Sequence, residues 1–115
     1  MGTPFYKQGV SGRGLRKPMR RLNAALCEVY GDIFITSTDE SAANRIVDSL
    51  HYPGFAEDIR NYAVKTQEGI PHIIWLDLAG LKGLCKRVSQ SLGIEDGFDI
   101  VEYDNFFHIE WDPKE

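Results

Sequence analysis

The hydrophobic pattern of the first third of the chain predicts a helix followed by a strand. Four apolar residues recur at the helical spacing of three or four positions: Leu22, Ala25, Leu26 and Val29. Pro18 fits the first turn of such a helix, where its missing N–H costs nothing, and Gly31 is a natural end. DIFITST (32–38) then alternates and is rich in β-branched and aromatic residues, which predicts a strand.

The middle of the chain predicts a polar loop and two further strands. Residues 39–55 are polar, with Pro53 and Gly54 near their end, and we expect a loop with at most one short helical turn. FAEDIRNYAV (55–64) alternates and predicts a strand. Residues 65–71 predict a turn, and HIIWL (72–76) predicts a short buried strand.

A second helix and a hairpin complete the pattern. Asp77 is placed to cap a helix that runs to about Leu92, and its inward face has five apolar residues: Leu78, Leu81, Leu84, Cys85 and Val88. FDIVEY (98–103) and FFHIEW (106–111) predict two strands joined by Asp104 and Asn105.

Two helices and four or five strands without regular βαβ alternation indicate an α+β fold with a small, largely antiparallel sheet. We expect residues 15–115 to form a single domain and residues 1–14 to form a flexible basic arm.

Composition places the chain among ordinary globular proteins: 115 residues, 43% hydrophobic and 26% charged. No apolar run approaches the roughly 18 residues that a membrane span needs. No signal peptide is evident, so we expect synthesis in the cytoplasm. Cys27 and Cys85 lie in apolar helical patterns and are interpreted as buried small side chains, not as a disulfide or a metal site.

Charge is uneven along the chain. The first 27 residues hold six basic residues and no acidic one, whereas the chain from Glu95 onward has eight acids against Lys114. A basic end raises nucleic-acid binding as a minor alternative. The formal net charge of −4 favours a solvated basic face instead. GVSGRG (9–14) lacks the Gly-Lys-Ser/Thr ending of a phosphate-binding loop.

Candidate chemistry centres on the three histidines. Zinc hydrolases use three ligands of the His, Asp or Glu type and leave the fourth position to water. His51, Asp58 and His108 supply such a set, and a metal would offset the cost of burying Asp58 in an apolar strand. The alternative is a structural trio of hydrogen-bonded side chains. His72, in the apolar segment 72–76, is interpreted as structural.

One stretch carries a recognisable motif. The pattern Ser-x-His-x-x-Gly-x-Ala-x-Asp is complete, with the residues Ser49, His51, Gly54, Ala56 and Asp58. In this the chain resembles the zinc D-Ala-D-Ala peptidases, which include phage peptidoglycan endopeptidases and carboxypeptidases with a hedgehog-like fold. The family's last ligand is often written His-x-His followed by an acid, and FFHIE (106–110) keeps the second His as His108.

The resemblance extends over most of the chain and implies a small α+β zinc-peptidase fold. It also implies that His51, Asp58 and His108 bind zinc and that Ser49 lies beside the substrate. Glu110 shares a side of its strand with His108. It either orients that ligand or ends in solvent.

Two departures from the family concern catalysis. The family has a catalytic Asp or Glu three residues before the last ligand, where this chain has Asn105. An amide cannot accept a proton as a carboxylate does, so Asp104 is the first candidate base and Glu102 the second. The family's arginine after the Thr-Ser strand end is also missing. Arg45 or Arg60 is the candidate replacement.

The leading hypothesis is a zinc-dependent peptidase that hydrolyses an amide bond in a peptidoglycan stem peptide or a similar short peptide by zinc-activated water. Such a protein would be phage-encoded and act at the cell wall. The alternative is a catalytically impaired zinc-binding or interaction protein on the same scaffold, such as a phage-borne binder, inhibitor or virion component. The sequence leaves open the stereochemistry of the substrate, endo- or exopeptidase cleavage and the oligomeric state.

Overall fold

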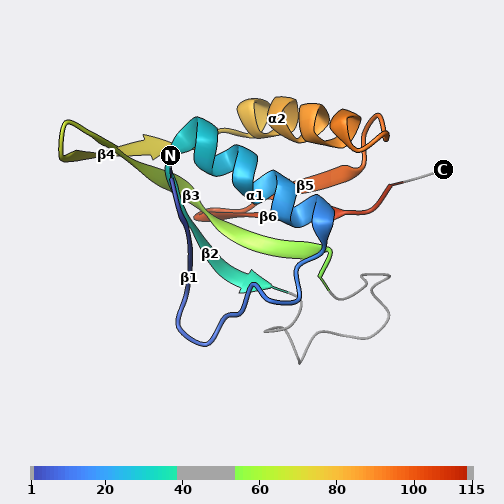
Figure 1. Ribbon diagram of the computed structural model, residues 1–115, viewed down its shortest axis with the longest axis horizontal. Helices are drawn as coiled ribbons and strands as arrows, with labels where there is room; N and C mark the ends of the chain where they lie inside the picture. The colour runs from blue at the N-terminus through green and yellow to red at the C-terminus, as the bar shows by residue number, and fades with distance from the viewer. Residues whose placement is uncertain (1, 39–53, 114–115) are drawn as a thin grey trace.

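The computed structural model describes residues 2–38 and 54–113, which form two helices over one face of a mixed, mostly antiparallel six-stranded sheet (Figure 1). This confirms the predicted α+β class. The sheet order is β1-β2-β3-β6-β5, and β4 also pairs with β3. The elements are β1 (Pro4–Tyr6), α1 (Lys17–Tyr30), β2 (Asp32–Thr38), β3 (Ala56–Gln67), β4 (Ile70–Trp75), α2 (Leu78–Ser91), β5 (Phe98–Glu102) and β6 (Phe106–Trp111).

The first helix begins and ends where the sequence predicts. Pro18 lies in the first turn of α1, and Gly31 follows its last residue with φ 103° and donates its N–H to Cys27 O. Leu22 and Leu26 are buried, as expected. Val29 is exposed instead, because it borders the surface groove between α1 and α2 and does not face the sheet.

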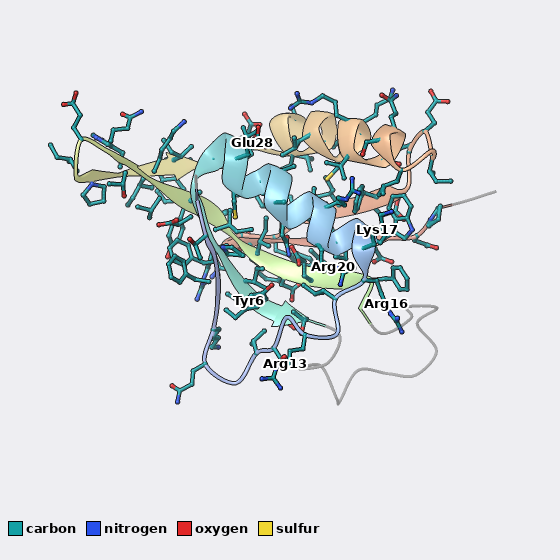
Figure 2. All side chains as sticks on the ribbon, in the orientation of Figure 1. Tyr6, Arg13, Arg16, Lys17, Arg20 and Glu28 are labelled. Carbon is teal, nitrogen blue, oxygen red and sulfur yellow. The ribbon has the colours of Figure 1, made fainter. Side chains whose placement is uncertain are left out.

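The N-terminal segment differs from the expected flexible arm. Residues 4–6 form β1, which pairs in parallel with residues 33–35 of β2. Further along, the Thr38 hydroxyl donates to Ser11 O at 2.9 Å. The basic side chains Arg13, Arg16, Lys17 and Arg20 gather around the start of α1 (Figure 2).

The hairpin of β3 and β4 is longer and more exposed than the sequence suggests. Its turn is limited to Glu68 and Gly69, whose φ values of 53° and 80° are typical of a two-residue hairpin turn. The predicted turn over 65–71 is therefore too wide. The prediction that 72–76 is a buried strand is also wrong, because most of β4 is exposed and, within the described part of the chain, β4 pairs with β3 alone.

The second helix is capped as predicted, since Asp77 Oδ1 accepts a hydrogen bond from Gly80 N at 2.6 Å. Neither helix in the described parts of the chain has the length and apolar run that crossing a membrane requires. At the other end of α2, the Ser89 hydroxyl accepts from Gly97 N and donates to Ile94 O, which fixes the path into β5.

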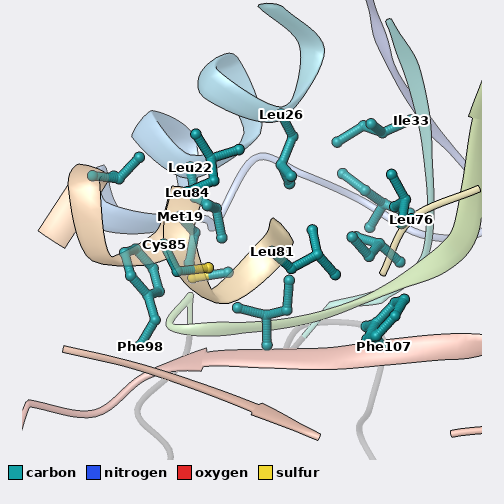
Figure 3. Packing of buried hydrophobic residues seen from close by; sticks show 14 of the residues in the cluster. Met19, Leu22, Leu26, Ile33, Leu76, Leu81, Leu84, Cys85, Phe98 and Phe107 are labelled. Atoms are coloured by element: carbon teal, nitrogen blue, oxygen red, sulfur yellow. The ribbon is translucent and has the colours of Figure 1, made fainter. Parts of the chain in front are cut away.

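The core fills the space between the helices and one face of the sheet (Figure 3). Its fully buried members come from both helices and three strands: Met19, Leu22, Leu26, Ile33, Ile35, Ile59, Ala63, Leu81 and Ile109. Cys27 and Cys85 are buried free thiols, as expected. The opposite face of the sheet has no helix over it among the described residues, and the candidate site lies on this face.

Candidate metal centre

Asp58 and His108 face each other on neighbouring strands. They form a directly opposed pair in the antiparallel ladder of β3 and β6. His108 Nδ1 lies 2.7 Å from Asp58 Oδ1, although 50 positions separate the residues in the sequence. The next residues in the two strands, Ile59 and Phe107, are buried in the core. Strand alternation therefore puts Asp58 and His108 on the helix-free face.

Glu110 holds the other side of the His108 ring. Its Oε1 atom lies 3.1 Å from His108 Nε2, so both ring nitrogens face a carboxylate. The side chains of His108 and Glu110 are 13% and 14% exposed, respectively. A carboxylate on one nitrogen fixes the orientation of an imidazole and leaves the other nitrogen available to a metal. Here Glu110 orients the ring through Nε2, and the nitrogen that is left for a metal is Nδ1, which faces Asp58.

An open hollow of about 320 Å³ adjoins the pair and is lined by Asp58, Tyr103, Phe106 and His108. The rings of Tyr103 and Phe106 stack with centroids 4.6 Å apart and planes 8° from parallel. The hollow therefore combines one polar wall with one aromatic wall. Such a combination suits a ligand that carries both a polar group and an apolar side chain.

The described part of the motif has clear structural roles. Gly54 has φ 90°, and a Cβ there would collide with Gly14 O. Gly54 O also accepts from Arg16 N at 2.9 Å. Ala56 is buried at the start of β3. The glycine and the alanine thus let the chain pass closely under the start of α1 and enter β3 in the register that points Asp58 at His108.

Three of the predicted residues, Arg45, Ser49 and His51, lie outside the described residues. Arg60 is two positions after Asp58 on β3 and opposite Phe106, so alternation puts it on the same face as Asp58. Arg60 is one of the two arginines, with Arg45, that the sequence suggests as candidates for binding substrate.

The candidate bases occupy the end of the β5–β6 hairpin. Asp104 and Asn105 lie in its exposed turn, where Tyr103 N donates to Phe106 O. Glu102 is opposite Phe107, a core residue, and therefore points to the other face of the sheet from His108. None of the three lines the hollow beside Asp58 and His108. Asp104 stays the first candidate, because its turn is the one that leads into the strand of His108.

Another acidic group was not anticipated from the sequence. Asp99, Glu110 and Asp112 offer oxygens within 4.8 Å of one another, and they are the one cluster of three metal-capable side chains in residues 2–38 and 54–113. The cluster is partly exposed. Since exposed acidic groups are common without an ion, we assign it no metal role.

The structure also contains a buried carboxyl group that was not predicted from the sequence. Glu57 is 1% exposed, and its Oε1 accepts a hydrogen bond from Asn23 Nδ2 at 2.9 Å. Burial raises the pKa of Glu57 to about 8. The signal was present in the alternation of residues 56–59, because a strand that points Asp58 outward must point Glu57 and Ile59 inward.

Comparison of the chain with protein-family models, with curated protein sequences and with solved structures finds no match.

Proposed function

We propose that this protein is a zinc-dependent peptidase that hydrolyses an amide bond in a peptidoglycan stem peptide or a similar short peptide. The observation that carries the proposal is the contact of Asp58 Oδ1 with His108 Nδ1, beside an open hollow and with Glu110 on the far nitrogen of the ring. The family resemblance implies both residues as ligands, Asp58 from the motif and His108 from the late strand, and they meet although 50 positions separate them.

The donor set fits zinc. An imidazole nitrogen and a carboxylate oxygen are both common zinc ligands, and they are presented here from two rigid strands. Asp58 and His108 would hold the metal together with His51. When bound, zinc supplies a Lewis acid that polarises the substrate carbonyl and lowers the pKa of a bound water.

The remaining residues would orient the reactants and move the proton. Glu110 fixes the ring of His108 through Nε2. Tyr103 and Phe106 form an apolar wall for a side chain of the peptide, and Arg60 binds a carboxylate or carbonyl oxygen of the substrate. Asp104 accepts the proton of the attacking water. Because Asp104 lies in an exposed turn, we expect the turn to close over the hollow when substrate binds.

The second candidate function is a zinc-binding protein without hydrolytic activity. Asn105 favours it, since this residue occupies the place of the family's catalytic carboxylate and cannot serve as a base. On this proposal the same hollow captures a peptide without cleaving it. A phage-borne binder, inhibitor or virion component would have these properties.

One experiment separates the two functions. Zinc-loaded protein is incubated with muropeptides, and the products are resolved by chromatography and mass spectrometry. For the peptidase we expect new fragments from the wild type and a loss of rate of about 100-fold or more in Asp104→Asn, with zinc retained. Glu102→Gln is the matched control and should keep its rate, because Glu102 lies on the other face.

Two other results would contradict the proposed peptidase. If the wild type is inert and Asn105→Asp gains activity, the protein is a binder on a peptidase scaffold. If Asp58→Ala and His108→Ala bind zinc as tightly as the wild type, the metal centre itself is refuted.

A further inference from the structure

Among residues 2–38 and 54–113, no strand pairs with the outer side of β4, which leaves the backbone groups on that side without a strand partner. Leu76 N donates to Asn61 O at 2.9 Å, which makes this pair a hydrogen-bonded pair of the β3–β4 ladder. Hydrogen-bonded and non-hydrogen-bonded pairs alternate in an antiparallel ladder. Trp75 and Ile73, one and three positions earlier, are therefore non-hydrogen-bonded toward β3. Their N–H and C=O groups point outward.

Pro71 fits the same alternation of hydrogen-bonded and non-hydrogen-bonded pairs. It lies two positions before Ile73, so its missing N–H falls on the outer side, and the ladder with β3 stays intact. The outer side thus offers the N–H groups of Ile73 and Trp75 and the carbonyls of all three residues. The turn end of this hairpin projects past both helices, at the left of Figure 1.

The side chains of this edge are apolar and exposed. Ile70 is 59% exposed, Ile73 60% and Trp75 68%. Trp75 meets the ring of Tyr62 edge-on, with centroids 5.9 Å apart, which holds it in place on the helix-free face. A free strand edge with exposed apolar side chains is a template for pairing with another strand.

Charge distinguishes β4 from the other outer strands of the described sheet. β5 carries Asp99 and Glu102, so two copies of it would repel each other. β1 has only three residues. β4 has the sequence IPHIIW, with no Asp, Glu, Lys or Arg. A strongly charged partner gains no attraction there, whereas a second copy of the same uncharged, apolar edge matches it without repulsion.

We propose that two copies of this chain pair antiparallel through β4, about a two-fold axis at Ile73, to form one continuous sheet. In this register the N–H and C=O of Ile73 bond those of the partner's Ile73. The N–H of Trp75 donates to the carbonyl of the partner's Pro71. The contact uses the same patch on both copies, so the assembly stops at two chains.

Sedimentation velocity over a range of protein concentrations tests the proposal. We expect a monomer–dimer equilibrium for the wild type and a monomer for Ile73→Lys, because a lysine at the centre of the pairing brings two like charges together. Ile70→Lys is the matched control. It removes an equally exposed isoleucine, but residue 70 turns its backbone toward β3 and lies beyond the paired segment, so this variant should still dimerise.

Amide hydrogen exchange gives a second measurement on the wild type alone. The amides of Ile73 and Trp75 should become protected as the protein concentration rises, whereas the amide of Ile74, which bonds to β3, should be protected at every concentration. A wild type that stays monomeric at high concentration, assemblies larger than two, or a dimer that Ile73→Lys leaves intact would each overturn the proposal. Binding of a foreign strand-forming peptide by a strictly monomeric protein would overturn it as well.

Discussion

Glu110 Oε1 lies 3.1 Å from His108 Nε2, two residues away on the same strand. This contact predicts that Glu110→Ala weakens zinc binding about 10- to 100-fold, since the residue that orients a ligand contributes about that much to metal affinity. Competition with a fluorescent zinc chelator measures the change.

The matched control for that variant is Asp112→Ala. Asp112 belongs to the same acidic cluster as Glu110, but its carboxylate has no hydrogen bond to His108 in the described structure. Zinc affinity should therefore be unchanged. Equal losses in the two variants would put the metal in the acidic cluster instead.

Gly54 and Gly83 should respond in opposite directions to the same substitution. Gly54 has φ 90°, and a Cβ would meet Gly14 O, so Gly54→Ala should lower the free energy of unfolding by roughly 2 kcal/mol or more. Gly83 lies within α2 with nothing within 4 Å of a new Cβ. Gly83→Ala should raise the free energy of unfolding by about 1 kcal/mol. Urea denaturation followed by circular dichroism measures both, and equal effects would contradict the steric argument.

Local pattern predicted the elements well because each has its own start and stop signals. Pro18, Gly31 and Asp77 mark helix ends by chemistry that acts within one turn of the chain. The edge position of β4 was missed because exposure depends on strand order. Nothing within HIIWL distinguishes a central strand from an edge strand.

In the candidate site, too, some residues could be found from local sequence signals, whereas the positions of others depend on how the strands pair. The motif gave Asp58, and the late strand gave His108, so their pairing could be expected from the resemblance to a family. The positions of Glu102 and Asp104 depend on the register of β5 against β6, which no local signal specifies. The burial of Glu57, in contrast, follows from the alternation of residues 56–59 within β3 and could have been predicted from the local pattern.

The Glu57 carboxyl should make stability depend on pH. In the native state it keeps its proton up to about pH 8, whereas the ordinary value is 4.5, so the native state binds more protons between these two values. The contribution of Glu57 to stability is then fully present below pH 4.5 and is lost as pH rises to about 8, by about 1.4 kcal/mol per pH unit within this interval.

Glu57→Gln tests this by keeping the shape of the protonated acid. Gln can also donate to Asn23 Oδ1, which has no partner in the described structure. In the presence of a chelator, the variant should lose the pH slope and be more stable than the wild type at alkaline pH. Glu95→Gln makes the same change at an exposed position and should keep the slope. A slope that survives in Glu57→Gln would assign it to another group.

The two thiols should be inert in the folded protein. Burial raises the pKa of Cys85 to about 12 and also raises the pKa of Cys27, and the thiolate is the form that alkylating reagents attack. Iodoacetamide should leave both residues unmodified in the native protein, as read by mass spectrometry. In denaturant both should react fully. Rapid native alkylation of Cys85 would contradict its burial between α2 and the sheet.

The pairing of Asp58 with His108 spans 50 positions of the chain and needs β6, the last strand of the described sheet. During synthesis, helix α1 and the sheet formed by β2, β3 and β4 can assemble from contacts closer in sequence, but Asp58 and His108 meet only after residues 106–111 have left the ribosome. A nascent chain arrested before β6 would thus hold most of its secondary structure and no complete metal centre. If Asp58 and His108 hold a metal as proposed, its capture requires β6 to be in place and therefore follows the assembly of the earlier strands.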